Sequence, residues 1–154
     1  MKKTQLLSLS GLFLICTLAV KAQVNTPSPS PQSTIIQKVG ISEVKIEYSR
    51  PSMKGRKVFG DLVSYNKIWR TGANAPTKLT FGDSMIVAGK KLAPGSYALY
   101  TIPNPTEWTI ILGKNANTPA GDHKEADDAV RFKVPVTTLT SAVESFTIEL
   151  ANLT

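Results

Sequence analysis

A run of specialised side chains between residues 67 and 77, KIWRTGANAPT, is the part of the sequence best suited to binding chemistry. Arg70 carries a planar guanidinium that can hold a carboxylate or phosphate with two hydrogen bonds, and Trp69 offers an apolar wall for a sugar ring. Gly72 and Asn74 tolerate positive φ, so a turn here can aim successive backbone N–H groups at one anion. The run predicts a site for a small anionic or sugar-like ligand.

A second polar segment, RPSMKGRK at 50–57, supplies further cations, and its Pro51 and Gly55 mark it as a shaped loop. If the two loops meet at one end of the fold, they form a cationic and aromatic site. The predicted ligand-binding residues are the arginine, aromatic and amide side chains of these loops and their surroundings: Arg50, Arg56, Tyr65, Trp69, Arg70 and Asn74. We expect the loop at 69–74 to pack on the loop at 50–57, with Arg70 near Arg56 or Arg50.

The same residues also fit a purely structural role. Trp69 can close the end of the core, and Arg70 can pair with Asp61 to pin two loops together. Asn74 and Thr71 can satisfy backbone groups within a turn. The sequence leaves both interpretations open.

The segment DHKEADD at 122–128 contains His123, the only histidine, among four carboxylates. Histidine and carboxylates together can bind a divalent metal. The spacing matches no metal-site pattern, and the order of a calcium-binding loop is absent. We therefore expect a solvated loop, and we predict no metal and no cofactor.

Catalytic signatures are missing from the sequence. It has no Gly-x-Ser-x-Gly elbow and no glycine-rich phosphate loop before a helix. We therefore favour a non-catalytic binding module over an enzyme. Two alternatives remain: a hydrolase that uses a pair of carboxylates, and a structural or assembly component that uses sheet edges.

Apolar and polar residues alternate along several short segments, which is the pattern of half-buried β-strands. The predicted strands share this alternation or a continuous apolar run: 44–48, 78–81, 84–87, 90–92, 96–102, 108–113, 130–134 and 146–150. Only Phe59, Leu62 and Val63 show helical spacing, and they span a single turn. The expected class is all-β, an antiparallel β-sandwich or jelly roll of about eight or nine strands.

The N-terminus has the pattern of a secretory signal peptide at 1–22, with a basic start, a short apolar stretch and a cleavage site after Ala22. Residues 23–33 are rich in proline and serine and predict an extended tether, so the single folded domain is expected at 34–154. We therefore expect a periplasmic or secreted protein with no membrane span after cleavage.

Cleavage would change both the charge and the cysteine count of the chain. It removes Cys16 and three of the 18 basic side chains, and leaves 15 basic against 11 acidic ones, a net charge of +4. So mild a charge on an exported protein does not favour a nucleic-acid partner. Without cysteine, disulfides and a thiol nucleophile are excluded.

Four segments resemble the family of exported bacterial proteins known as domain of unknown function 2911 (DUF2911). The longest is EYSRPSMKGRKVFGDLVSYNKIWRTGANAPTKLTF at 47–81, and the others lie at 87–103, 107–112 and 143–150. The resemblance covers nearly all of the domain. It implies an exported domain of mainly β structure and no established activity.

The chain departs from the family pattern in two places. Relatives carry aromatic residues in the loop after the strand at 107–112, whereas residues 115–128 contain none. Relatives also continue with a further pair of strands past the segment at 143–154. We therefore expect that the sheet lacks its last strands, and that an open sheet edge allows self-association.

Overall fold

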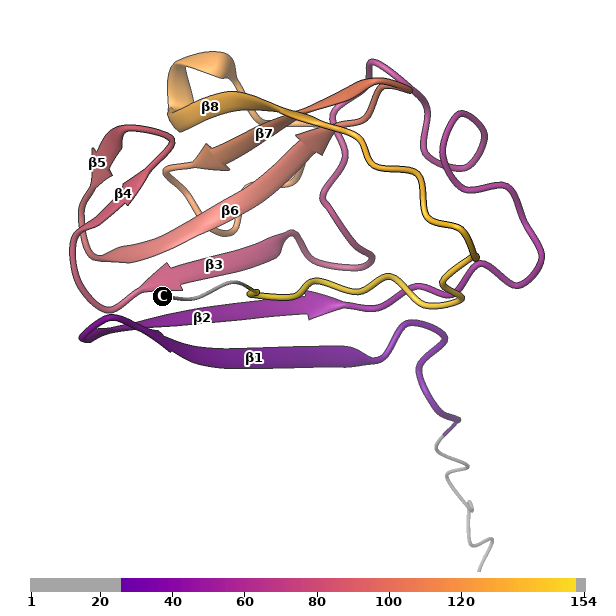
Figure 1. Ribbon diagram of the computed structural model, residues 1–154, viewed down its shortest axis with the longest axis horizontal. Helices are drawn as coiled ribbons and strands as arrows, with labels where there is room; N and C mark the ends of the chain where they lie inside the picture. Colours follow the sequence, from indigo (N-terminus) through magenta and orange to yellow (C-terminus); the bar gives the residue numbers. More distant parts are fainter. Residues whose placement is uncertain (1–25, 152–154) are drawn as a thin grey trace, which may run out of the picture.

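The computed structural model describes residues 26–151, and in this range the chain folds into antiparallel β-sheets (Figure 1). The predicted signal peptide, Cys16 and the first residues of the predicted tether lie outside the described residues. The strands are β1 (Gln32–Val39), β2 (Ser42–Ser49), β3 (Thr77–Phe81), β4 (Met85–Val87), β5 (Lys90–Leu92), β6 (Gly95–Ile102), β7 (Glu107–Gly113) and β8 (Asp128–Pro135). A single 3₁₀ turn, η1 (Glu125–Asp127), precedes β8.

Six strands form one sheet in the order β1-β2-β3-β6-β7-β8, and β4 and β5 form a separate hairpin. Every neighbouring pair is antiparallel. The predicted all-β antiparallel class and the expected number of strands are therefore confirmed. No helix in the described part of the chain is long and apolar enough to cross a membrane.

Seven of the predicted strands match observed ones, and three segments differ from the prediction. Residues 32–39 form β1, which begins two residues before the predicted start of the domain at 34. The segment at 146–150 joins no ladder, although Phe146, Ile148 and Leu150 are half-buried and alternate with exposed residues. The apolar spacing at 58–63 forms turns rather than a helical turn, with Val63 N–H donating to Val58 O.

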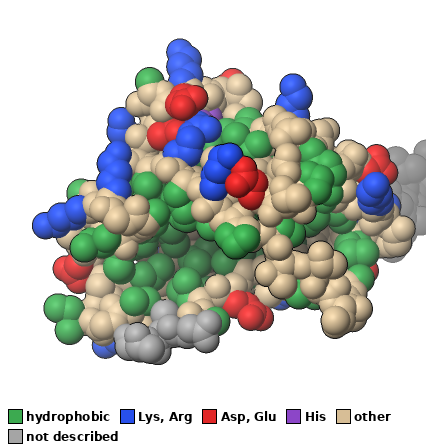
Figure 2. Space-filling view, turned by 45° about the horizontal axis from the view of Figure 1, so that its top comes forward, with side chains coloured by type: hydrophobic (Ala, Val, Ile, Leu, Met, Phe, Trp, Pro, Cys, Tyr) green, Lys and Arg blue, Asp and Glu red, His purple; other side chains and the backbone are tan. Residues whose placement is uncertain are grey.

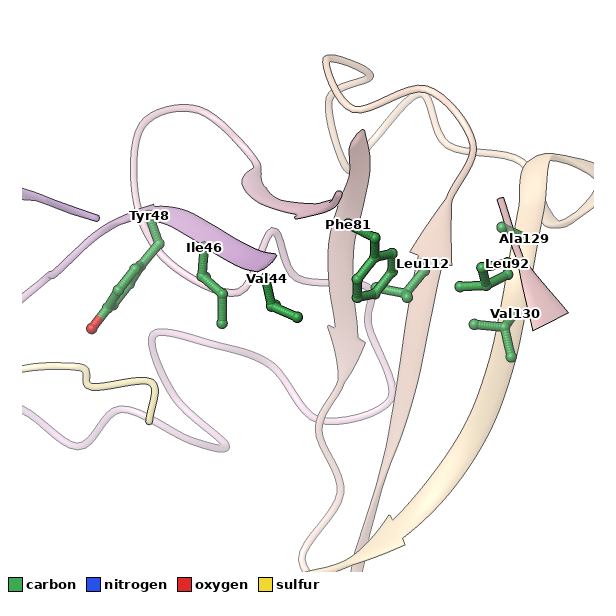
Figure 3. Packing of buried hydrophobic residues seen from close by; sticks show 8 residues of the cluster. All are labelled: Val44, Ile46, Tyr48, Phe81, Leu92, Leu112, Ala129 and Val130. Carbon is green, nitrogen blue, oxygen red and sulfur yellow. The ribbon is translucent and has the colours of Figure 1, made fainter. Parts of the chain in front are cut away.

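The sheet is apolar on both faces at its centre, which explains the continuous apolar run in β6. Ala98 and Tyr100 lie on one face with Ile111, while Tyr97 and Leu99 face the main core cluster. Figure 3 shows that cluster, whose fully buried members are Val44, Ile46, Tyr48, Phe81, Leu92, Leu112, Ala129 and Val130. Hydrophobic side chains gather in a hollow on this side of the molecule (Figure 2).

The C-terminal segment, residues 136–151, crosses the same side of the sheet (Figure 1). Phe146, Ile148 and Leu150 pack on the main core cluster. Individual bonds hold this segment in place of a ladder: Arg50 Nε donates to Phe146 O at 3.0 Å, Ile148 N–H donates to the Tyr48 hydroxyl at 3.1 Å, and Phe146 N–H donates to Pro51 O at 2.9 Å. The segment therefore covers the core as a single extended chain.

Removing the Arg50 side chain is expected to loosen this segment. We expect Arg50→Ala to lower the free energy of unfolding by about 1–2 kcal/mol, because two charge-assisted hydrogen bonds are lost at a half-buried position. The second of these bonds joins the guanidinium to Thr147 Oγ1 at 2.8 Å. Urea denaturation measures the change. Arg50→Lys keeps the charge but loses the two-pronged geometry, so it should recover less than half of the loss.

Candidate functional site

A large cleft, of about 1300 Å³, lies between the loop at 51–63 and the C-terminal segment. Its apolar lining includes the exposed side chains of Leu62, Leu139 and Val143. Pro29 and Ser30, just before β1, also reach it. Segments far apart in the sequence therefore build one concave surface, which is the usual form of a ligand site.

Four aromatic rings line this cleft and pack edge to face. Trp69 lies 5.9 Å from Phe59, 6.3 Å from Trp108 and 5.2 Å from Phe146, measured between ring centroids. Phe59 and Trp108 are 4.7 Å apart. All four side chains are half-buried, so the cluster both closes one end of the core and presents ring surface to the cleft.

Cationic side chains lie along the loop side of the cleft. Lys54, Arg56 and Lys57 are exposed and line it, while Glu144 and Glu149 line it from the C-terminal segment. Arg56 uses two of its five N–H groups to bond Met53 O and Ser52 O, each at 2.9 Å. These bonds fix the guanidinium on its own loop and leave its other N–H groups for a ligand.

The run at 69–74 is a turn that hydrogen bonds within the protein hold in place. Trp69 N–H donates to Thr101 O at 2.7 Å, and Thr77 Oγ1 donates to Thr71 O at 2.6 Å. Gly72 is required because its φ is +156° and a Cβ there would lie 3.0 Å from Ser49 O. The loop therefore packs closely against the end of β2.

The arginines of the two loops do not share a common partner. Arg70 is exposed and donates to Asn74 O at 2.6 Å, and Asn74 Nδ2 donates to Ser49 Oγ at 3.2 Å. Arg50 bonds the C-terminal segment instead, and Arg56 bonds its own loop. Within residues 26–151, Arg70 forms no ion pair with Asp61. The Arg70–Asp61 ion pair of the structural interpretation is therefore not observed, and the proximity of Arg70 to Arg50 or Arg56 stays a prediction.

The predicted site residues divide between three places. Arg56 and Trp69 line the large cleft, and Tyr65 lines a neighbouring cleft of about 470 Å³ together with Phe59 and Trp108. Arg50 bonds two residues of the large cleft's wall, Phe146 and Thr147, without lining the cleft itself. Arg70 and Asn74 lie outside both clefts.

The sequence indicated Lys54 and Lys57 as cations of the second loop, but it did not indicate Phe59, Trp108 and Phe146 as lining residues of the same cleft. Trp108 lies in β7, Phe59 in the loop after β2 and Phe146 in the C-terminal segment. No spacing in the sequence joins them, because the sheet order brings them together. The available signal was the rarity of tryptophan: both tryptophans of the chain line the same cleft.

His123 lies in a different environment from the solvated loop that we predicted. Its side chain is only 3% exposed, and its Nε2 is 2.6 Å from Asp128 Oδ1. Arg131 Nε donates to the other oxygen of Asp128 at 2.6 Å. The Tyr100 ring lies 4.6 Å from the imidazole, and burial raises the pKa of the Tyr100 hydroxyl above its ordinary value. This network attaches the loop at 114–127 to the sheet.

Within residues 26–151, no three histidine, cysteine, aspartate or glutamate side chains come together as a group that could hold a metal ion. Asp128 is engaged by His123 on one oxygen and by Arg131 on the other. Asp128 therefore acts in attaching the loop to the sheet.

Comparison with known proteins identifies the family. A family model described as "Protein of unknown function (DUF2911)" matches residues 30–154. No curated protein and no solved structure gives a match. The matched range contains all eight strands and both clefts except Pro29, which lies one residue before it. The chain therefore belongs to the DUF2911 family, as its segments between residues 47 and 150 predicted.

Proposed function

We propose that this protein is a non-catalytic binding module for a small ring-shaped ligand, sugar-like in size, that carries an anionic group. The ligand occupies the 1300 Å³ cleft, and the protein acts after export from the cell. The observation that carries the proposal is the combination of two tryptophans on the wall of this cleft with three cationic side chains on its loop side.

The aromatic wall supports binding of the ring. Trp69 and Trp108 meet edge to face, at an interplanar angle of 83°, so they offer differently oriented surfaces. Indole rings bury a large area on contact and also present an N–H. The Trp69 Nε1–H already donates to Gly72 O at 3.1 Å, which fixes the ring before a ligand arrives. A fixed ring reduces the entropy cost of binding.

The cationic side supports binding of the anionic group. Arg56 is held by two backbone carbonyls, so its guanidinium has a defined position. Lys54 and Lys57 flank it and add charge without a fixed direction. A guanidinium that is held in position, as that of Arg56 is, provides directed hydrogen bonds to a carboxylate or phosphate.

The hydrolase alternative has one observation in its favour: Glu144 and Glu149 line the same cleft. Glu144 Oε1, however, accepts the backbone N–H of Lys54 at 2.9 Å, and Glu144 O accepts the N–H of Met53 at 2.8 Å. These bonds give Glu144 a structural role in joining the C-terminal segment to the loop. A binding module therefore accounts for more of the residues that line the cleft than a hydrolase does.

A thermal-shift series tests the proposal with glucose, galacturonate and glucose 6-phosphate. We expect the two anionic sugars to raise the melting temperature and glucose to raise it less. A ligand at 100 times its Kd stabilises the folded state by about 2.7 kcal/mol. Arg56→Gln should abolish the difference in melting-temperature shift between the anionic sugars and glucose. Trp108→Leu should reduce the shift for all three sugars.

Arg70→Gln is the matched control, since Arg70 is an exposed arginine outside the cleft. It should leave the ligand-induced shifts unchanged. Equal shifts in the wild type and in Arg56→Gln would contradict the assignment of the anionic group to this loop. Cleavage of the methyl glycoside of galacturonate, which has the glycosidic bond that the free sugars lack, would favour the hydrolase instead.

A further inference from the structure

The two edges of the six-stranded sheet, β1 and β8, differ in how they meet solvent. Among the described strands, each pairs on one side only. An unpaired edge offers a row of N–H and C=O groups to another strand, so soluble proteins usually protect it. Only one of the two edges, that of β1, is open to such pairing.

The β8 edge is protected in three ways. Its register with β7 shifts between Leu112 and Gly113, which leaves Ala129 as an extra residue on β8 and distorts the edge. Arg131 and Lys133 are exposed along it and hold ion pairs with Asp128 and Glu107. Pro135 ends the strand and has no N–H to offer.

The β1 edge has none of these features apart from one lysine. Its eight residues, QSTIIQKV, pair with β2 in an unbroken register from Gln32–Ser49 to Val39–Ser42. It contains no proline, and Lys38 is its only charged residue. Ile36 is 58% exposed. Such a regular, weakly charged edge is the kind that accepts another strand.

The direction of the free backbone groups follows from the bond that starts the ladder. Arg50 N–H donates to Pro31 O at 2.9 Å, so residue 31 faces β2. Backbone groups alternate in direction along an antiparallel strand. The N–H and C=O groups of the even-numbered residues therefore point away from β2: Gln32, Thr34, Ile36 and Lys38.

We propose that a second copy of this chain pairs with the free edge of β1, antiparallel and about a two-fold axis through Ile35. In this register Thr34 lies opposite the partner's Ile36, and Gln32 lies opposite the partner's Lys38. The four outward residues of each copy then face one another and form hydrogen-bonded pairs. The two sheets join into one continuous sheet, and the faces that carry the main core cluster lie on the same side of it.

The side chains of β1 fit this self-pairing. The Thr34 and Ile36 pairs join β-branched residues, which favour strands and pack well across a ladder. Ile35, which packs on the core cluster, meets the partner's Ile35 on the same side of the sheet. Lys38 never faces another lysine in this register. The interaction is isologous, so it closes at two copies rather than growing into a fibre.

Sedimentation velocity over a range of concentrations tests the proposal with two substitutions at one residue. The wild type is expected to be a dimer, and Thr34→Val should remain one because it keeps the outward N–H. Thr34→Pro removes that N–H without touching the ladder to β2, so its mass should fall to half. Proline is tolerated at an outward edge position. Circular dichroism and a thermal melt establish that both variants fold.

Hydrogen exchange on the wild type gives an independent readout if Thr34→Pro fails to fold. The amides of Thr34 and Ile36 should exchange more slowly as the protein concentration rises, whereas that of Ile35, which faces β2, should not change. A wild type that stays monomeric up to its solubility limit would overturn the proposal. A Thr34→Pro variant that folds and dimerises like the wild type would overturn it as well.

Discussion

Replacement of Trp69 by alanine is expected to lower the free energy of unfolding by about 3 kcal/mol, the lower end of the range for a large aromatic side chain. Trp69 touches Phe59, Trp108 and Phe146, which come from three different parts of the chain. Its removal leaves a hole where these parts meet. The value is at the lower end because the side chain is half-buried.

Trp69→Phe separates ring packing from the indole hydrogen bond. It keeps an aromatic ring in the cluster and loses the bond from Nε1 to Gly72 O, so we expect a smaller loss of about 1–2 kcal/mol. Urea denaturation followed by circular dichroism measures both variants. A loss below about 1 kcal/mol for Trp69→Ala would show that the aromatic cluster does not stabilise the fold.

The strands that alternate strictly between apolar and polar residues could be predicted from the sequence. Val44, Ile46 and Tyr48 in β2 are buried, and the intervening residues are not. The period of two comes directly from the pleat, so one buried face is enough to reveal the strand. β6 has buried residues on both faces, and its apolar run revealed it in the same way.

Two segments show where this signal fails. β1 is an edge strand with most of its side chains exposed, so its sequence carries little alternation and it was missed. The segment at 146–150 alternates as clearly as β2, yet it pairs with no strand within the described residues. Alternation reports burial of one face; a ladder also needs a neighbouring strand, which depends on topology.

The candidate site was predictable in its parts but not in its assembly. The sequence predicted contact between the loops at 69–74 and 50–57, and in the structure Asn74 bonds Ser49, the last residue of β2 before the second loop. Which arginine faces the cleft depends on backbone acceptors: Arg70 is turned to Asn74 O, and Arg56 to Met53 O. Carbonyl positions follow from the folded turn, and the sequence does not contain them directly.

Tyr48 is the residue whose loss is expected to cost most, because it joins the core to the C-terminal segment. Its side chain is 4% exposed, and its ring lies 5.7 Å from that of Phe146 at an angle of 88°. We expect Tyr48→Ala to lower the free energy of unfolding by about 4 kcal/mol, through the cavity it leaves in the main cluster and the contacts it removes from Phe146. Thermal and urea denaturation measure the loss.

Tyr48→Phe tests the hydroxyl alone, and here the expected result is local. The ring remains, but the Ile148 N–H loses its acceptor, so we expect a loss of about 1 kcal/mol. The Ile148 amide should exchange faster with solvent, while the amides of β6 at the sheet centre keep their protection. The C-terminal segment joins no ladder within the described residues, and backbone bonds such as Phe146 N–H to Pro51 O hold it together with side-chain bonds from Arg50 and Tyr48. Unchanged exchange at Ile148 in Tyr48→Phe would mean that burial of Phe146, Ile148 and Leu150 is sufficient to fix the segment.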